Sequence, residues 1–385
     1  MVKLKDICTI NPKAPTLSDD MLVSFVPMSK VGENGEFDPT DTREYGTVKK
    51  GFTSFKNGDV LFAKITPCME NGKGAIARSL VNGYGYGSTE FHVLRPNSDM
   101  VTSEWLYYLT SWTEFRKNAE SNMTGSAGQK RVPKSFLEQY EINLPSIEEQ
   151  GRITNQLDVL VHLISLRKEQ LAKLDELVKA RFVEMFGDPV YNPNRWKTET
   201  VESVCKEIYG GGTPSKSHPE YYENGDIPWV SSKDMKTDIL SDSQIYINQL
   251  GVDNSTAKMV PVNSVVMVIR SGILKHTLPV AINIVPITVN QDLKVFIPGA
   301  DILPLFMMFQ FKMLEKDILS GVRAVTADNI EFNTLKQREI MIPPLDIQHE
   351  FAAFVEQTNK TKLTIQASLD KLEVMKKALM QEYFG

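Results

Sequence analysis

Cysteine is scarce in this sequence of 385 residues, and the three cysteines lie far apart with no CxxC pair. An odd number of widely spaced cysteines predicts neither a disulfide framework nor a zinc site. We therefore expect Cys8, Cys68 and Cys205 to be small, half-buried thiols, and we expect no metal ion on this chain.

Long hydrophobic runs are also missing. The longest apolar stretches, residues 262–269 and 303–311, are much shorter than the roughly 20 residues that a membrane-spanning helix needs. Residues 1–10 contain no apolar core of signal-peptide length. With 42% hydrophobic and 24% charged residues the composition is that of a globular protein, and the length favours two or more cores. We expect a cytoplasmic protein that has no membrane contact.

A surplus of basic residues is absent, since the formal net charge is -5. This balance counts against indiscriminate nucleic-acid binding. It does not exclude a protein that reads a specific sequence, because the 43 lysines and arginines can gather on one face. Help from a basic partner would also fit the acidic balance.

The motifs of enzymes that modify or cut DNA are incomplete. DPVY at 188–191 resembles the motif with which adenine methyltransferases hold the target amine, but Val190 stands where the second proline belongs. A nuclease needs clustered carboxylates around Mg²⁺, and Asp292 with Lys294 supplies only half of that pattern. Residues 210–214 lack the Lys-Ser/Thr ending of a phosphate loop, and the five histidines have no HExxH or triad spacing. We therefore expect no catalytic site and no cofactor on this chain.

An internal repeat organises the chain. EINLPSIEEQ at 141–150 aligns with EIMIPPLDIQ at 339–348 at an offset of 198 residues, and EMFG at 184–187 aligns with EYFG at 382–385 at the same offset. In the middle the offset changes, because STEFHVL at 88–94 aligns with NQDLKVF only at 202. The chain therefore consists of two long repeats with constant ends and variable middles.

A helical pattern of about 35 residues follows each proline-containing motif. Apolar residues alternate spacings of four and three over about five heptads, which predicts a seam that packs against a partner helix. Two equivalent seams in one chain can bury each other, and a pseudo-twofold relation between the repeats would make the helices antiparallel, with the variable middles at opposite ends. Each helix would be on the order of 50 Å long. The predicted spacer-helix seam consists of Ile153, Leu157, Leu160, Ile164, Leu171, Leu174, Val178, Phe351, Val355, Ile365, Leu369, Leu372 and Leu379.

Four charged residues interrupt this seam: Arg167, Arg181, Lys362 and Lys376. They either set the register of the helix pair or extend their charged ends into solvent. The alternative is that charges are merely tolerated at the edge of the seam.

These patterns predict an α+β fold, in which two mixed α/β domains are separated by a long antiparallel two-helix coiled coil within a pseudo-twofold internal repeat. β-branched and aromatic residues predict strands at 59–65, 91–95, 262–270 and 293–297, and short helices are expected at 103–118 and 303–319. The expected boundaries are a first variable domain at 1–145, a first spacer helix at 146–187, a linker at 188–195, a second variable domain at 196–343 and a second spacer helix at 344–385.

Loops rich in glycine and asparagine in both variable domains combine Lys or Arg with Ser, Thr, Asn and Gln. Arg and Lys bind phosphates or guanine edges, and Asn and Gln bind adenine edges. Loops on a rigid scaffold suit such contacts, although each residue taken alone is also an ordinary solvated loop residue. The candidates for DNA contact are Lys64, Thr66, Asn71, Lys73, Ser126, Gln129, Lys130, Arg131, Thr213, Ser215, Lys216, Ser231, Ser232, Lys233, Arg270, Ser271, Lys275, Arg323 and Asn329.

Four segments carry a resemblance to a known family. They are the repeated LPSIEEQ and IPPLDIQ, each at the head of a long helix, LFAKITPCMENGKGAI in the first variable domain, and GTPSKSHPEYYENGDIPWVSSKDM in the second. Together with the two-repeat layout they resemble the DNA specificity subunits of type I restriction-modification systems over essentially the whole chain. The resemblance implies that the variable domains are target-recognition domains. Each would read one half of a bipartite, asymmetric site on double-stranded DNA, with the helices as a spacer.

The resemblance also implies partner subunits. Two modification (methyltransferase) subunits would supply S-adenosylmethionine-dependent adenine methylation, and a restriction (translocase-nuclease) subunit would supply ATP-driven translocation and Mg²⁺-dependent cleavage. The chain itself would be a non-catalytic specificity subunit without a cofactor. One departure is SIEE at 146–149 where the second repeat has PLDI, which makes the first helix start less well defined.

Two other functions remain open. A two-domain coiled-coil scaffold that binds protein or another polymer would fit the acidic net charge, and DNA binding with a steep dependence on salt would argue against it. A stand-alone DNA methyltransferase or nuclease would be active when the pure chain is incubated with DNA and either S-adenosylmethionine or Mg²⁺.

The spacer role makes a prediction about length. Inserting or deleting one heptad in a single helix will change the spacer of the recognised DNA site and leave both half-sites unchanged. Sequencing the methylated sites of host DNA measures spacer and half-sites together. Altered half-sites at a constant spacer length would contradict the spacer role.

Overall fold

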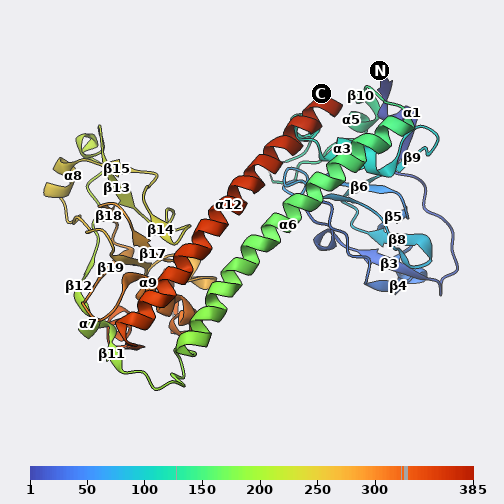
Figure 1. Cartoon of the computed structure of the whole chain (residues 1–385). Helices are drawn as coiled ribbons and strands as arrows, with labels where there is room; N and C mark the ends of the chain where they lie inside the picture. Colours follow the sequence, from blue (N-terminus) through green and yellow to red (C-terminus); the bar gives the residue numbers. More distant parts are fainter. Residues whose placement is uncertain (127, 322, 325–327) are drawn as a thin grey trace. The chain divides into compact units, whose positions relative to one another are not determined.

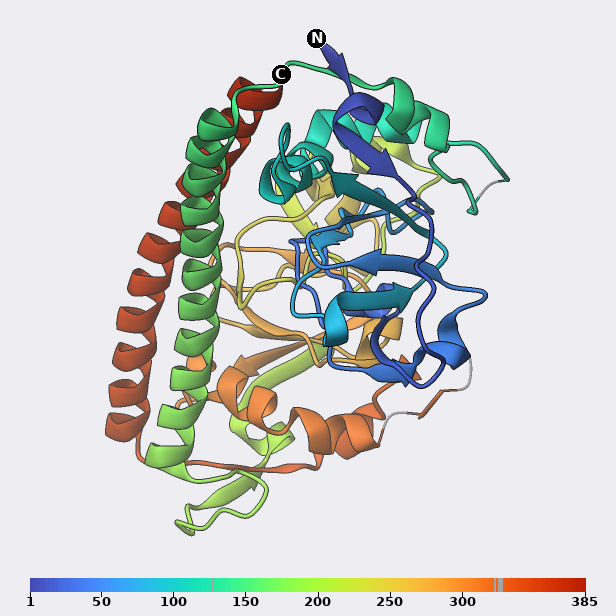
Figure 2. The ribbon, with the colours of Figure 1, turned by 90° about the vertical axis from the view of Figure 1, so that its right-hand side faces the viewer.

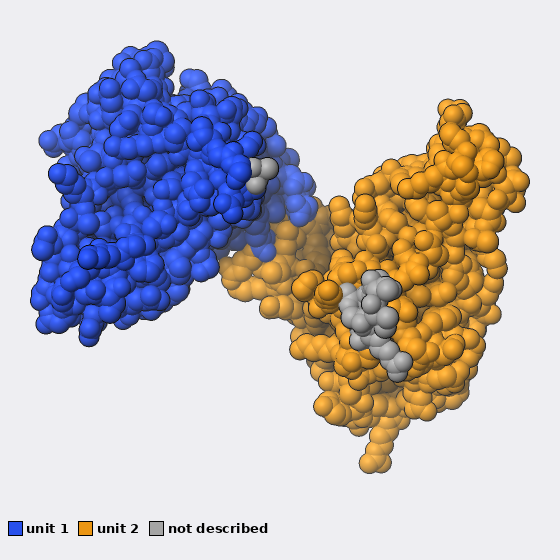
Figure 3. Space-filling model, turned by 180° about the vertical axis from the view of Figure 1, so that it is seen from behind, with its two compact units in different colours: residues 1–168, 366–385 blue, residues 169–365 orange. Residues whose placement is uncertain are grey.

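The computed structural model describes residues 1–126, 128–321, 323–324 and 328–385. Two compact units make up the chain (Figure 3): unit 1 comprises Met1–Lys168 and Gln366–Gly385, and unit 2 comprises Glu169–Ile365. Two helices of 40 residues each, α6 (Ile147–Phe186) and α12 (Leu345–Phe384), contribute one part to each unit (Figure 1). Each unit is therefore built from one variable domain and a pair of helix segments.

Two four-stranded sheets form the variable domain of unit 1. The first sheet has the order β2-β9-β6-β7 and is antiparallel throughout, and the second has the order β4-β3-β8-β5 with β3 and β8 parallel. Strand β1 pairs with β10. The strands are β1 (Val2–Lys3), β2 (Cys8–Ile10), β3 (Leu22–Val26), β4 (Thr42–Glu44), β5 (Thr53–Lys56), β6 (Val60–Ala63), β7 (Gly74–Ile76), β8 (Tyr84–Gly87), β9 (Phe91–Pro96) and β10 (Glu141–Ile142). The helices are α1 (Leu4–Ile7), η1 (Met28–Lys30), α2 (Tyr45–Val48), η2 (Val81–Gly83), α3 (Ser103–Ser111), α4 (Thr113–Ser121) and α5 (Lys134–Gln139).

Helix α3 lies against the first sheet, where the sequence is apolar without interruption. All four residues of β6, Val-Leu-Phe-Ala, are buried, as suits a strand covered on both faces. The Thr102 side chain accepts a hydrogen bond from the backbone N–H of Trp105 (3.1 Å) and so caps the start of α3. The prediction of one helix over 103–118 is wrong at Trp112. Its backbone is extended and its ring is buried, so the chain turns there before α4 begins.

The variable domain of unit 2 repeats this order of elements. Its first sheet, β12-β19-β16-β17-β14, corresponds to the first sheet of unit 1 with β14 added, and its second, β15-β13-β18, again contains a parallel pair, β13 with β18. The strands are β11 (Thr198–Thr200), β12 (Cys205–Gly210), β13 (Ile227–Val230), β14 (Ile239–Leu240), β15 (Tyr246–Ile247), β16 (Val265–Val268), β17 (Val280–Asn283), β18 (Thr288–Val289), β19 (Leu293–Pro298), β20 (Arg323–Ala324), β21 (Asp328–Asn329) and β22 (Glu339–Met341). The helices are α7 (Val201–Val204), η3 (Pro219–Tyr221), α8 (Gln249–Asp253), η4 (Gly272–Lys275), α9 (Pro304–Met313), α10 (Glu315–Ser320) and α11 (Phe332–Lys336).

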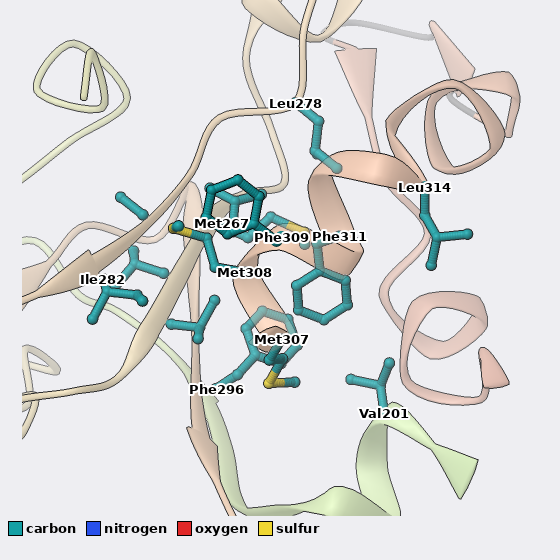
Figure 4. Packing of buried hydrophobic residues seen from close by; sticks show 14 of the residues in the cluster. Val201, Met267, Leu278, Ile282, Phe296, Met307, Met308, Phe309, Phe311 and Leu314 are labelled. Carbon is teal, nitrogen blue, oxygen red and sulfur yellow. The ribbon is translucent and has the colours of Figure 1, made fainter. Parts of the chain in front are cut away.

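The core of unit 2 lies between α9 and its first sheet (Figure 4). Met307 and Phe311 of α9 are buried beside Phe296 of β19, and the ring centroids of Phe296 and Phe311 are 5.4 Å apart. The prediction of one helix over 303–319 is wrong at Leu314, where α9 ends before α10 begins. Leu314 is buried in the same core, so an apolar residue marks the break here as Trp112 does in unit 1.

The long helices pair in antiparallel fashion within each unit, and Figure 2 shows them side by side. In unit 1 the Tyr383 hydroxyl donates to Gln156 (2.6 Å) and Lys168 binds Glu373 (3.0 Å), so later residues of α6 meet earlier residues of α12. The same order holds in unit 2, where the contacts are the ion pair of Arg181 with Glu350 (2.8 Å) and that of Lys362 with Asp175. Arg181 and Lys362, which interrupt the seam, therefore bind the partner helix.

Burial along the predicted seam is uneven. Five of its buried members, Ile153, Leu157, Val178, Phe351 and Val355, belong to the hydrophobic cores of the variable domains. Leu160, Ile164 and Leu369 are buried as well, outside these cores. Leu171, Leu174, Ile365, Leu372 and Leu379 are only partly buried. Domain packing accounts for part of the difference only, because Leu379 packs against the core of unit 1 and is still only partly buried.

The repeated glutamine at the start of each long helix joins that helix to its domain. In unit 1 the Gln150 carbonyl accepts from the backbone N–H of Thr102 (2.9 Å), and its amide donates to the carbonyls of Met100 (2.9 Å) and Pro145 (3.0 Å). Gln150 is completely buried. The proline of the motif thus supplies one acceptor, and the residue before α3 supplies the donor.

Unit 2 repeats the same three bonds with Gln348. Its carbonyl accepts from the backbone N–H of Leu303 (2.8 Å), directly before α9, and its amide donates to Asp301 O (3.0 Å) and Pro343 O (2.8 Å). The repeated motif therefore encodes one buried joint, which we call the glutamine joint.

The repeated EMFG and EYFG ends also pack in equivalent ways. Phe186 of α6 contacts Phe306 of α9 in unit 2 (4.7 Å between ring centroids), and Phe384 of α12 contacts Trp105 of α3 in unit 1 (5.3 Å). Gly187 follows α6 with a φ of +81°, a conformation that favours glycine and ends the helix. Each variable domain thus packs against the first turns of one long helix and the last turns of the other.

The glutamine joint predicts a specific loss of stability. Gln348→Ala leaves one backbone N–H and two carbonyls, of which that of Pro343 is buried, without the side chain that binds them. We therefore expect unit 2 to lose about 2 to 4 kcal/mol. Urea unfolding measures the loss, and faster amide hydrogen exchange at residues 303–313 locates it. Gln357→Ala, at an exposed position of the same helix, is the matched control and should change stability by less than about 0.5 kcal/mol. Equal losses in the two variants would contradict the role of the joint.

Candidate nucleic-acid interface

Two loops of unit 1 carry the predicted DNA-contact residues of that unit. One connects β6 to β7 (residues 64–73) and the other connects α4 to α5 (residues 122–133). Backbone hydrogen bonds join them, because Thr66 N–H donates to Lys130 O (3.0 Å) and Val132 N–H donates to Lys64 O (2.9 Å). The structure therefore brings candidates from distant parts of the sequence to one place.

An ion pair ties the joined loops to the sheet. Arg131 donates from Nε and Nη2 to the two carboxylate oxygens of Glu90 (2.9 and 2.8 Å), directly before β9, and from Nη1 to Gln129 O (3.0 Å). This planar two-point contact fixes both position and orientation, and it holds the pKa of Glu90 below its usual range. Arg131 is thus committed to the loop itself. Lys130 is exposed, and its ammonium group has no bonding partner in the described part of the chain.

The buried His92 forms a hydrogen bond with the α4–α5 loop. His92 Nε2 lies 2.8 Å from Val132 O, and a carbonyl can only accept, so Nε2 carries the proton. The other nitrogen, Nδ1, then accepts from the Asn11 amide (3.0 Å). His92 is thereby fixed as a neutral ring that links β2, β9 and the α4–α5 loop.

The same two loops recur in unit 2. The β16–β17 loop (269–279) meets the α10–α11 loop through the backbone pairing of Arg270 with Asn329. Arg270 Nε donates to Asp292 (2.7 Å), which stands directly before β19 as Glu90 stands before β9. In unit 1 the arginine comes from the α4–α5 loop, and in unit 2 it comes from the β16–β17 loop. The ion pair recurs although a different loop supplies its cation.

Two further segments of unit 2 reach the turn that precedes β19. The Thr213 hydroxyl hydrogen-bonds to Gln291, and the N–H of Asn290 donates to Val230 O (2.9 Å), directly before Ser231. Thr213 and Ser231 therefore lie beside the same turn that anchors the β16–β17 loop.

A groove of about 850 Å³ in unit 2 is lined by Ser232, Lys233 and Ser271. Lys179 of α6 and Lys236 line it as well, and neither side chain has a bonding partner among the described residues. Three of the predicted contact residues therefore share one cationic groove.

Some of the remaining candidate side chains form hydrogen bonds within the protein, and others are exposed. Lys73 donates to Met28 O (3.1 Å) and Thr66 donates to Glu70 (2.8 Å), so both help to shape their loop. Ser231 and Asp234 are bonded to each other in the same way. The exposed candidates are Asn71, Ser126, Gln129, Lys130, Thr213, Ser215, Lys216, Lys233, Arg270, Lys275 and Asn329. Arg323 lies in β20 by its backbone, but its side chain is outside the described part of the chain.

Sequence reasoning missed the residues that hold these loops. Glu90 and Asp292 align at the offset of 202, and this alignment is the sequence signal that marks them as equivalent acids. Arg116 on α4 and Glu315 on α10 also bind the loops, and no repeat or motif marked them.

The described residues contain no group of three or more histidine, cysteine, aspartate or glutamate side chains that could hold a metal ion. The three cysteines are free thiols, and burial raises the pKa of Cys8 and of Cys205 to about 12. No helix in the described ranges is long and apolar enough to cross a membrane.

A family model described as "Type I restriction modification DNA specificity domain" matches residues 1–176 and again residues 193–374. The two matches correspond to the two repeats of the sequence, and together they cover most of the chain.

Curated relatives match over shorter stretches. The EcoAI specificity subunit of Escherichia coli is 44% identical over 177 residues, which is 45% of this chain and 30% of that protein. The EcoR124I/EcoR124II specificity subunit of Escherichia coli is 34% identical over 191 residues, or 49% of this chain and 46% of that protein. The chain thus spans less than half the length of these two relatives. The MjaIX specificity subunit of Methanocaldococcus jannaschii is 25% identical over 300 residues, which covers 73% of this chain and 68% of that protein.

Solved structures share the fold over the whole chain. A chain from the structure described as "Structural basis underlying complex assembly and conformational transition of the type I R-M system" has a TM-score of 0.62 at 19% identity, covering 99% of this chain and 96% of that one. The type I restriction-modification S subunit from M. genitalium has a TM-score of 0.56 at 13% identity, covering 100% and 95%. At these identities the likeness concerns the fold.

His92 predicts how the stability of unit 1 depends on pH. Burial lowers the pKa of His92 below its usual 6.5, and Lys64 and Lys134 lower it further, while the bond to Val132 O opposes the shift. The unfolded chain therefore takes up this proton at a higher pH than the folded chain does. The contribution of His92 is present in full above about pH 6.5, and it is lost as the pH falls below that value, by at most about 1.4 kcal/mol per pH unit.

Urea unfolding between pH 7 and pH 5 tests this dependence. His92→Gln keeps a neutral hydrogen-bonding group and should flatten the pH dependence of the free energy of unfolding. His162→Gln, at an exposed position on α6, is the control and should behave as the wild type does. If His92→Gln loses stability with acid as steeply as the wild type, the buried neutral histidine is not responsible.

Proposed function

The chain belongs to the family of type I restriction modification DNA specificity domains, and on that premise we propose that it selects the DNA sequence on which partner enzymes act. Each unit would read one half of a bipartite, asymmetric site on double-stranded DNA. One observation carries the proposal: both units present the same pair of joined loops, at the same strand ends, with different side chains. Two domains that bind different DNA sequences need the same loop architecture with different side chains at the base contacts.

Exposed lysines on one joined loop of unit 1 and on two other segments of unit 2 support contact with DNA. Lys130 in unit 1, and Lys216 and Lys233 in unit 2, are exposed and lack a bonding partner among the described residues. Ammonium groups of this kind bind phosphates, which contribute affinity without sequence information. The net charge of -5 keeps that affinity modest for the isolated chain, so we propose that selection is effective in the assembled complex.

We propose that α6 and α12 set the spacer between the half-sites and also dock the methyltransferase subunits. Each helix is continuous over 40 residues and passes from one unit into the other, which supports the spacer role. Each also exposes large apolar side chains, among them Val159, Leu363 (71% exposed) and Val374 (69% exposed). Helices that expose such residues beside an already formed seam suit a protein partner.

The chain would be non-catalytic in this assembly. S-adenosylmethionine would be bound by the two modification subunits, and ATP and Mg²⁺ would be bound by the restriction subunit. The domain bounds 1–145 and 196–343 for the two target-recognition domains, with 146–187 and 344–385 as spacer helices, belong to this proposal.

A protein-binding scaffold is the second candidate, because the net charge is acidic and the long helices expose apolar side chains. DNA binding that falls steeply with salt would separate the two candidates, since a scaffold without phosphate contacts has no such dependence.

The free lysines provide the experiment. Lys130→Ala, Lys216→Ala and Lys233→Ala should each weaken binding of the complex to its site and to unrelated duplexes by a similar factor. Each should lower the slope of log affinity against log salt by about 0.9, as expected for one lost phosphate contact. Lys371→Ala, an exposed lysine of α12, is the control and should change neither quantity.

Titration of fluorescent duplexes between about 50 and 200 mM salt, with and without the methyltransferase subunits, measures both quantities. Binding that is independent of salt in the wild-type complex would reject DNA selection in favour of the scaffold.

A further inference from the structure

A buried arginine lies beneath the β6–β7 loop of unit 1. Arg116 of α4 is 8% exposed, its Nη1 donates to Met69 O at 2.7 Å, and its Nη2 lies 3.5 Å from Lys73 O. The guanidinium carbon is 5.2 Å from the centre of the Phe62 ring. No carboxylate among the described residues forms an ion pair with it. A cation is thus buried here to bind two backbone carbonyls of one loop.

This arrangement is costly for the fold. A guanidinium that is buried without a carboxylate loses hydration that neutral acceptors only partly replace. Burial lowers the pKa of Arg116 to about 10, so the group stays charged at neutral pH, and its Nε has no hydrogen-bond partner in the described structure. We attribute the retention of this unfavourable buried charge to its bonds with the loop carbonyls of Met69 and Lys73.

Unit 2 shows that the helix itself does not need this charge. Arg116 N–H donates to Trp112 O and Ile318 N–H donates to Leu314 O, so Ile318 occupies the equivalent position of α10. Ile318 is a buried apolar residue. An arginine at this position is therefore a property of unit 1 and of its loop.

The equivalent loop of unit 2 is held from the same helix by the opposite chemistry. Glu315, the first residue of α10, accepts hydrogen bonds from the N–H of Leu278 (2.9 Å) and the hydroxyl of Thr277 (3.1 Å). One unit thus fixes its loop with a donor to carbonyls, and the other fixes its loop with an acceptor for N–H and O–H groups.

We propose that Arg116 is a positioning residue that sets the shape of the 64–73 loop and thereby the base preference of unit 1, and that Glu315 does the same for the 269–279 loop of unit 2. The inference rests on the proposed function. The two carbonyls bound by Arg116 belong to Met69 and Lys73, on either side of the exposed Asn71. Because one guanidinium binds both carbonyls, it limits the backbone conformations that the turn between them, which carries Asn71, can adopt.

Removing Arg116 removes the side chain that links the two ends of the turn, and it should leave unit 1 folded. Met69 O also accepts from Gly72 N–H (3.1 Å), and Lys73 O also accepts from Ala63 N–H (3.2 Å). Neither carbonyl is therefore left without a partner in Arg116→Met, which retains an apolar stem beside Phe62.

The test uses the full chain assembled with its methyltransferase subunits and a library of DNA duplexes randomised over the recognised site. For Arg116→Met we expect discrimination against wrong base pairs to fall by about tenfold in one half-site and to stay unchanged in the other, which is the size of one lost base contact. Glu315→Leu should have the reciprocal effect in the other half-site. Lys117→Met removes a neighbouring charge of α4 whose ion-pair partner, Glu114, lies on the same helix, and it should leave both half-sites within about twofold.

The outcomes separate positioning from general stability. Unchanged discrimination in folded Arg116→Met, or an equal loss in both half-sites, overturns the inference. If Arg116→Met does not fold, Arg116→Lys decides, since one ammonium cannot reproduce the two-point contact: reduced discrimination in the one half-site supports the inference and wild-type discrimination overturns it. A wild-type complex without any base preference would instead overturn the proposed function.

Discussion

The glutamine joint is the interaction on which the rest of each unit depends. A primary amide donates and accepts at fixed angles, and the completely buried Gln150 and Gln348 each use these groups on three backbone partners. The long helix cannot slide or rotate against its domain without breaking these bonds. The donor of each joint lies directly before α3 or α9, so the first sheet and the loops that it carries are oriented by the same contact.

The loops above the joint combine a constant frame with variable contacts. In both units a carboxylate directly before β9 or β19, Glu90 or Asp292, binds an arginine from one of the two joined loops. The two pairs are partly exposed, and such pairs contribute little net stability. Their effect is to orient the loops, and the supplying loop can differ between units because either one passes within reach of the acid. Arg116 and Glu315 add a second attachment, with opposite chemistry, from the helix below.

Much of the architecture could be predicted because its signals are local. The heptad pattern places side chains on one face of a helix whatever surrounds it, and α6 and α12 are the long helices that the pattern predicted. The breaks at Trp112 and Leu314 could not be predicted in this way, because both residues are apolar and continue the helical composition while their backbones leave it. The burial of Ile153, Leu157, Val178, Phe351 and Val355 in the domain cores depends on residues far away in the sequence, and periodicity carries no information about that.

By itself the sequence determined that there are two repeats, that each ends in a long helix with an apolar seam, and that polar residues suited to DNA gather in a few loops of the variable middles. These properties follow from spacing and composition within short windows. Only the tertiary structure decided that the β6–β7 and α4–α5 loops meet, that Arg131 and Arg270 are held by carboxylates, and that Arg116 is buried without one. Each of these depends on two groups far apart in the chain, and their distance in space is fixed by packing that no local pattern encodes.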